Sequence, residues 1–126
     1  MNDLIIKQGK FSPEVQFLAS GSLKITGRSI LKYSSELYAD AINWLREFDK
    51  LKHPALTLNL SLDALDTASV RCMVELVRTL NNFINCEKIK INWCYEKFDE
   101  DLMDIGSAIQ QLSKVEFNLL EVENEA

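Results

Sequence analysis

The chain has 126 residues, of which 47% are hydrophobic and 26% are charged, and its formal net charge is −5. This length and composition are typical of one globular domain that buries a sizeable core. Nucleic-acid binding needs a cationic face, and the scattered lysines and arginines exclude it. No apolar run approaches the roughly 20 residues that span a bilayer. The N-terminus lacks a secretory signal, so we expect a cytoplasmic protein with no membrane partner.

The N-terminal part of the chain predicts an arm followed by a hairpin. We expect residues 1–13 to form the arm, and the apolar alternation at 15–19 and 23–26 to form two strands. Gly21 lies between these strands and favours a tight hairpin turn. Residues 28–33 have no clear period and are expected to form a loop.

Apolar residues at helical spacing predict three helices with capping side chains. Their expected bounds are 34 or 35 to about 48, 67 to about 84, and 99 to about 112. Ile84 and Leu112 are expected to be the last inward residues of the second and third helices. Gly106 inside the third helix indicates either a close approach of the backbone to the sheet or a weak helix. Trp44 lies off the main apolar stripe of the first helix, which fits a partner anchor or an edge-packed structural residue.

Strict apolar alternation predicts three more strands. They are 55–61, 88–95 and 115–122. Residues 62–65 are expected to form a short connection. The resulting order, ββαβαβαβ, makes the strands that helices join parallel, and right-handed crossovers place the helices on one side. The sequence therefore predicts a two-layer α/β domain over 1–126, with a mixed sheet and a frayed acidic tail at 123–126.

The most informative stretch is the turn between the 55–61 strand and the second helix. Asp66, Thr67 and Ser69 bring a carboxylate and two hydroxyls to a helix N-terminus. Unpaired N–H groups create a positive local field there, which would hold a phosphate. The alternative is an ordinary N-cap, with Asp66 or Thr67 contributing about 1 kcal/mol to the helix.

The sequence does not indicate a catalytic, cofactor or metal site. His53 is the one histidine, and no serine has the context of a nucleophile elbow. The three cysteines show no CxxC spacing and are interpreted as reduced, mostly buried thiols. The acids at 99–101 are better explained by helix capping than by a cation site. We therefore expect a non-enzyme without cofactors, the alternative being a small enzyme that uses Asp66 or Cys72.

Residues 66–69 resemble the phosphorylatable Asp-Ser-Ser-Gly-Leu segment of STAS domains in anti-sigma factor antagonists. They resemble more closely the Asn-Thr-Ser-Ser turn of the SiaC-like biofilm-regulation phosphoproteins. Residues 91–95 resemble that family's Val-Asn-Trp-Tyr-Tyr strand, and 36–38 and 44–45 resemble its Glu-Phe-Tyr and Trp-Leu motifs. The resemblance covers roughly 17–122. An aspartate and an alanine replace the family's asparagine and first serine in the turn, which bears on partner choice.

The resemblance implies a STAS-like regulatory phosphoprotein that acts as a partner switch and has no catalytic activity. In that family the unphosphorylated form binds and activates a diguanylate cyclase, which makes cyclic di-GMP and promotes biofilm. A cognate serine/threonine protein kinase phosphorylates the threonine, and a metal-dependent serine/threonine phosphatase removes the phosphate. The phosphoacceptor role is carried to Thr67, with Ser69 as second choice.

A phosphate on Thr67 would add a charge of about −1.5 to −2. Arg71, one turn further along the helix, would help to neutralise it. Leu62 and Leu65 are candidate apolar contacts for the partner, the alternative being burial in the domain's own core. The expected partner-binding set is Leu62, Leu65, Asp66, Thr67, Ser69 and Arg71. Two alternative functions stay open: an anti-sigma factor antagonist that acts through an anti-sigma kinase, and a purely structural interaction domain.

Overall fold

The computed structural model describes residues 1–30 and 35–123. In chain order its elements are β1 (Leu4–Ile6), β2 (Glu14–Phe17), β3 (Ser22–Ser29), α1 (Ser35–Lys50), β4 (Ala55–Leu65), α2 (Thr67–Asn81), β5 (Lys88–Glu96), α3 (Glu100–Gln110) and β6 (Glu116–Val122). The predicted order is confirmed from β2 onward. The strand β1 was not predicted and lies inside the expected N-terminal arm.

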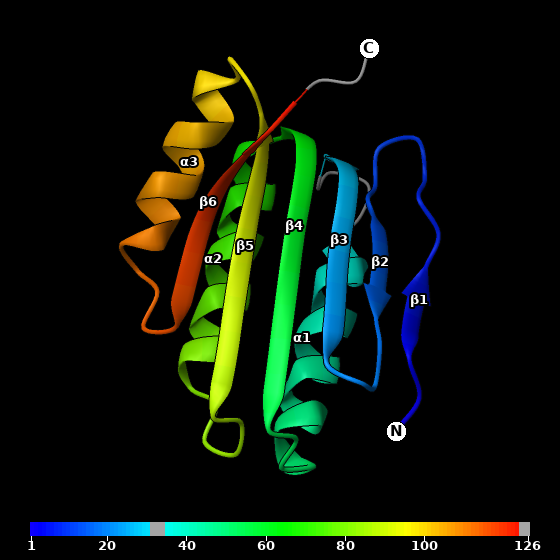
Figure 1. Cartoon of the computed structure of the whole chain (residues 1–126). Helices are drawn as coiled ribbons and strands as arrows, with labels where there is room; N and C mark the ends of the chain where they lie inside the picture. Colours follow the sequence, from blue (N-terminus) through cyan, green and yellow to red (C-terminus); the bar gives the residue numbers. More distant parts are fainter. Residues whose placement is uncertain (31–34, 124–126) are drawn as a thin grey trace.

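The strands form one six-stranded sheet in chain order, β1 to β6 (Figure 1). The pairs β1–β2 and β2–β3 are antiparallel, whereas β3, β4, β5 and β6 run parallel. The predicted mixed sheet is therefore confirmed. Because parallel strands are joined by crossover helices, the carboxyl ends of β3, β4 and β5 and the starts of the three described helices meet at one edge of the sheet.

The core lies between the sheet and the helices. The central strand β4 places four leucines on the covered face, each at most 5% exposed: Leu56, Leu58, Leu60 and Leu62. The intervening residues of β4 face the other side of the sheet. Among them, Asn59 accepts on Oδ1 a hydrogen bond from the side-chain amide of Asn92 at 2.8 Å. This division into an apolar and a polar face follows from the period of two along a strand.

Residues 62–65 continue strand β4 and are not the expected connection. The parallel pairing with β3 continues here, with Leu62 opposite Gly27 and Leu65 opposite Ser29. The register shifts between Gly27 and Arg28, so one extra residue of β4 is accommodated without ending the ladder. Correspondingly, β3 extends to Ser29, into the stretch that was expected to be a loop. Residues 31–33 of that loop and the proposed cap Ser34 lie outside the described residues.

The second and third helices end earlier than predicted. Ile84 is 86% exposed and Leu112 is 48% exposed, so neither is an inward helical residue. After the end of α2, the carboxylate of Asp49 accepts the backbone N–H groups of Ile84 and Asn85 at 3.2 and 2.9 Å. These hydrogen bonds fix a non-helical turn and offset the loss of helical ones.

At Gly106 the backbone of α3 lies close against side chains of the sheet. A Cβ at this position would lie 2.4 Å from Cδ1 of Trp93 and 2.9 Å from Cδ2 of Leu119. The indole of Trp93 is held in place because its Nε1–H donates to the carbonyl of Leu102 at 2.9 Å. Close packing, rather than a weak helix, therefore explains this glycine. The expected cap Asp99 is confirmed, since it accepts the N–H of Leu102 at 3.1 Å.

Trp44 is a structural residue rather than an exposed anchor. It is 8% exposed and stacks on Phe48 with ring centroids 5.3 Å apart. Its Nε1–H donates to the carbonyl of Asn2 at 2.9 Å, so the N-terminal segment covers it. In the part of the chain that the structure describes, no helix is long and apolar enough to cross a membrane.

Candidate functional site

The predicted hydroxyl turn lies where β4 ends and α2 begins. The strand ends at Leu65, Asp66 is the N-cap, and Thr67 is the first helical residue. The N–H of Asp66 donates to the carbonyl of Ser29 at 3.2 Å, which extends the strand pairing into the turn. The turn therefore sits at the carboxyl edge of the parallel strands, where α/β sheets generally carry their binding sites.

Of the two capping side chains that the sequence allowed, Asp66 is the one that acts as N-cap. Its backbone is extended, with φ −88° and ψ 172°, and Oδ1 accepts the N–H of Ser69 at 2.8 Å. The first intrahelical hydrogen bond runs from Val70 N–H to the Asp66 carbonyl at 3.1 Å. The amides of Thr67 and Ala68 precede that bond, so they contribute to the positive field at the helix start.

The two hydroxyls of the turn have opposite surroundings. Thr67 is exposed, whereas Ser69 is fully buried at 0% exposure. The Ser69 hydroxyl donates to the carbonyl of Ser29 at 2.8 Å and lies 2.7 Å from Ser29 Oγ. An enzyme can reach the Thr67 hydroxyl from solvent, whereas reaching Ser69 requires the helix start to open.

Ser69 belongs to a buried hydroxyl cluster that joins three elements: Ser29 of β3, Tyr38 of α1 and Ser69 of α2. Ser29 Oγ lies 2.5 Å from Tyr38 Oη. Because the Ser69 proton goes to the Ser29 carbonyl, Ser29 must donate to Ser69 Oγ, and Tyr38 must donate to Ser29 Oγ. Every proton of the cluster thus has an acceptor. Burial raises the pKa of Tyr38 to about 12, so its hydroxyl keeps this proton near neutral pH.

Sequence analysis did not identify Ser29 or Tyr38 as parts of the site. Ser29 fell in a stretch without periodicity that was expected to be a loop. Tyr38 was predicted to lie on the inward stripe of the first helix and within a motif that resembles the family, but it was not assigned to the site. Both are buried beneath the turn, where they hold the start of α2 against β3 and α1. A single serine between an arginine and an isoleucine gives no signal for such a contact before the fold is known.

The other predicted partner contacts divide into accessible and buried residues. Arg71 is exposed and lies one turn after Thr67 on α2. Leu62 is 5% exposed, and Leu65 is half-buried and packs against the core. The alternative of burial in the domain's own core therefore holds for Leu62, because it continues the inward face of β4. Of the predicted partner-binding set, Thr67 and Arg71 are exposed, and Asp66, like Leu65, is half-buried.

The turn does not have the properties of a catalytic thiol or metal site. Burial, followed by the nearby carboxylates of Asp66 and Glu75, raises the pKa of the Cys72 thiol. A nucleophilic cysteine needs the opposite shift, since the thiolate is the reactive form. Among residues 1–30 and 35–123, no group of three or more His, Cys, Asp or Glu side chains is arranged to hold a metal ion.

Comparison with known proteins identifies relatives over nearly the whole chain. A family model described as "SiaC family regulatory phosphoprotein" matches residues 6–122. A curated relative, an uncharacterized protein of Pseudomonas aeruginosa strain UCBPP-PA14, is 25% identical over 113 residues. The aligned region is 88% of this chain and 90% of the relative.

Solved structures of SiaC from Pseudomonas aeruginosa share the fold. Apo-SiaC superposes with a TM-score of 0.84 at 22% identity, over 95% of this chain and 99% of that chain. A second structure of SiaC gives 0.85 at 23% identity, over 97% and 100%. The third is a crystal structure of the diguanylate cyclase SiaD in complex with its activator SiaC, with a TM-score of 0.87 at 22% identity. That match covers 95% of this chain and all of the matched chain.

Proposed function

Because this chain belongs to the SiaC family of regulatory phosphoproteins, we propose that it is a partner switch that binds and activates a diguanylate cyclase when unphosphorylated. Two findings support the proposal. The family match extends over residues 6–122, which include the whole hydroxyl turn. The structurally similar SiaC of Pseudomonas aeruginosa is the activator of the cyclase SiaD in a solved complex.

The switch in this proposal is Thr67, and the observation that carries it is the contrast with Ser69. Thr67 is exposed at the start of α2, whereas Ser69 is fully buried in the hydroxyl cluster. A kinase therefore has access to one hydroxyl and not to the other. The second choice, Ser69, is better explained as a structural residue.

A phosphate on Thr67 is compatible with the fold. The amides at the start of α2 favour a negative charge, by about 0.3–1 kcal/mol at an exposed position. Arg71 lies one turn away on the same helix and is exposed, so it can approach the phosphate. The neighbouring Asp66 carboxylate opposes these effects, because two like charges repel. We expect the balance to leave the domain folded.

For a partner that packs over Thr67, the phosphate is unfavourable. The partner has to remove water from a group that carries about −1.5 to −2 charges. Each 1.4 kcal/mol of this penalty weakens binding about tenfold, so a few kcal/mol suffices to release the partner. The same fold thus exists in two binding states that differ by one covalent group.

The proposal includes a cognate serine/threonine kinase, a metal-dependent serine/threonine phosphatase and no catalytic activity of the chain itself. The raised pKa of the Cys72 thiol supports the last point. All three cysteines are free, which fits the reducing conditions of a cytoplasmic location.

The test uses Thr67→Ala and Thr67→Glu, with Ser20→Glu as control. Ser20 is exposed in the turn between β2 and β3, at the opposite edge of the sheet, so it receives the same charge far from the site. Each tagged variant is used to capture partners from cells of the source organism, and a captured cyclase is then purified and assayed with each variant. We expect Thr67→Ala and Ser20→Glu to bind and activate it, and Thr67→Glu to remain folded but fail.

Two results would overturn the proposal. One is equal activation of the cyclase by Thr67→Ala and Thr67→Glu. The other is capture of an anti-sigma kinase in place of a cyclase, which would assign the chain to transcriptional control.

A further inference from the structure

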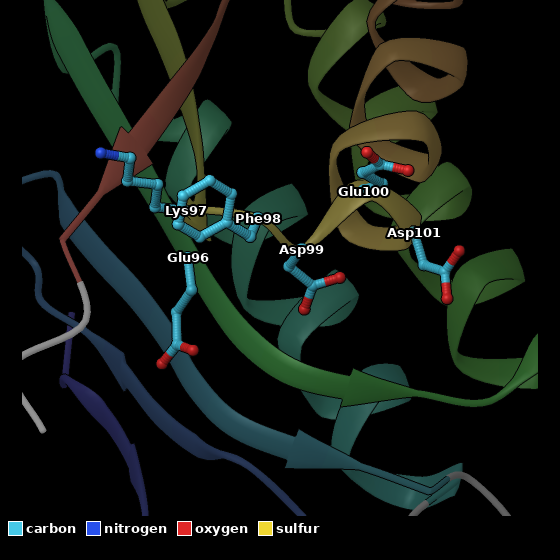
Figure 2. Close-up of a pocket in the computed structure, with 6 residues that line it drawn as sticks. All are labelled: Glu96, Lys97, Phe98, Asp99, Glu100 and Asp101. Atoms are coloured by element: carbon cyan, nitrogen blue, oxygen red, sulfur yellow. The ribbon is translucent and has the colours of Figure 1, made fainter.

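The turn between β5 and α3 presents a large apolar side chain to solvent. Phe98 is 85% exposed and has φ 74°, in the left-handed region that favours glycine. The ammonium nitrogen of Lys97 lies 5.3 Å from the centroid of the Phe98 ring (Figure 2). Local packing therefore does not require a phenylalanine here, and the backbone would be more relaxed with a glycine in its place.

The surroundings of Phe98 combine apolar and acidic groups. A hollow of about 190 Å³ is lined by Tyr95, Phe98, Asp99, Glu100, Met103 and Glu121. Two aromatic rings and a methionine supply apolar surface, and the three carboxylates supply negative charge without a cation among the lining residues. No cluster in the described part of the chain is arranged to hold a metal ion. This charge pattern complements an arginine or lysine whose aliphatic stem packs against rings.

The hollow lies at the same edge of the sheet as Thr67. Strands β4 and β5 are parallel neighbours, with Ser61 opposite Cys94. Four residues after Ser61 β4 ends at Leu65, and two residues after Cys94 β5 ends at Glu96. The turns that follow these two strands are therefore adjacent, as Figure 1 shows at the upper end of the sheet.

We propose that Phe98 and its acidic hollow form a second contact for the cyclase that Thr67 controls: Phe98 enters an apolar recess of that protein, and an arginine or lysine beside the recess enters the hollow. This proposal rests on the proposed function, since it assigns the occupant to the same partner. In this arrangement the partner's cation lies over Tyr95, Phe98 and Met103 and not over Thr67. It therefore does not neutralise a phosphate on Thr67, which would have to displace the partner surface packed there.

The first test replaces Phe98 by glycine. Glycine adopts a positive φ without strain, so Phe98→Gly should unfold at a temperature no lower than the unchanged protein. The matched control is Ile84→Ala, which removes an equally exposed side chain, 86% exposed, from the turn between α2 and β5 at the opposite edge. The probe is the cyclase purified by capture, and its dissociation constant is measured by titration calorimetry. We expect Phe98→Gly to weaken binding about tenfold or more, and Ile84→Ala to leave it unchanged.

The second test reverses one charge of the hollow. Glu121→Lys should weaken binding and reduce its dependence on salt, because it removes the charge complementarity. Glu87→Lys makes the same change at an exposed position at the opposite edge and should have neither effect. Wild-type affinity in both Phe98→Gly and Glu121→Lys would overturn the inference. If Thr67→Glu still abolishes binding in that case, the proposed function stands without this contact, whereas full binding of Thr67→Glu refutes the proposed function itself.

Discussion

Replacing Ser69 by alanine tests whether this hydroxyl is structural, as its burial indicates. The substitution removes the donor to the Ser29 carbonyl at 2.8 Å and the acceptor 2.7 Å from Ser29 Oγ. The carbonyl keeps a second donor, the Asp66 N–H at 3.2 Å. The Ser29 hydroxyl proton, in contrast, loses its acceptor at a site with 0% exposure. A buried unsatisfied donor costs about 1–3 kcal/mol, so we expect Ser69→Ala to lower the free energy of unfolding by about 2 kcal/mol.

Urea unfolding followed by circular dichroism measures this change, and Thr67→Ala is the control. The exposed Thr67 side chain should change the free energy of unfolding by no more than about 0.5 kcal/mol. After treatment with the kinase, intact mass should show one phosphate on Ser69→Ala and none on Thr67→Ala. The reasoning is refuted if Ser69→Ala is as stable as the unchanged protein, or if Thr67→Ala is the variant that still gains the phosphate.

Two further predictions concern the core and the hydroxyl cluster. Gly106→Ala should lower the free energy of unfolding by about 1–3 kcal/mol, although alanine favours a helix by about 1 kcal/mol, because its Cβ would lie 2.4 Å from Trp93; an unfolding midpoint in urea at or above that of the unchanged protein would contradict this. The pKa of Tyr38 is raised from 10.0 to about 12, so the unfolded chain ionises first as pH rises. The contribution of this pKa shift to the free energy of unfolding is fully present below pH 10 and decreases by about 3 kcal/mol as the pH reaches 12. Tyr38→Phe should not show this loss of stability between pH 10 and pH 12. If the free energy of unfolding falls equally with pH in both proteins, the tyrosine is not buried as described.

The sequence predicted the order of most elements because strict alternation and helical spacing are local signals. It misplaced the strand ends for a non-local reason. The residues 62–65 carry no distinct strand pattern of their own, and they are extended because β3 lies beside them and pairs as far as Ser29. Ile84 was misassigned for a related reason, since the Asp49 carboxylate that stops the helix comes from α1, far away in the chain.

The structure brings Asp66, Thr67 and Ser69 together at the start of α2, as the sequence predicted, but the surroundings of each side chain were not predictable. Asp66, Thr67 and Ser69 were recognised as a group from their types and spacing. Which hydroxyl is exposed depends on how the start of α2 packs against β3 and α1, where Ser69 joins the buried cluster with Ser29 and Tyr38. No local pattern encodes that contact. The sequence therefore ranked Thr67 and Ser69 as candidate phosphoacceptors by resemblance alone. The difference in their exposure is the physical reason for preferring Thr67.

The most direct test of the account compares one protein in two covalent states. The chain is phosphorylated to completion by its kinase, the position of the phosphate is mapped, and half of the sample is then dephosphorylated. Calorimetric titration of both halves into the purified cyclase gives two dissociation constants. The account predicts tight binding by the dephosphorylated half, and affinity lower by a hundredfold or more, about 3 kcal/mol, for the half that carries phosphate on Thr67. Equal dissociation constants for the two halves would contradict it.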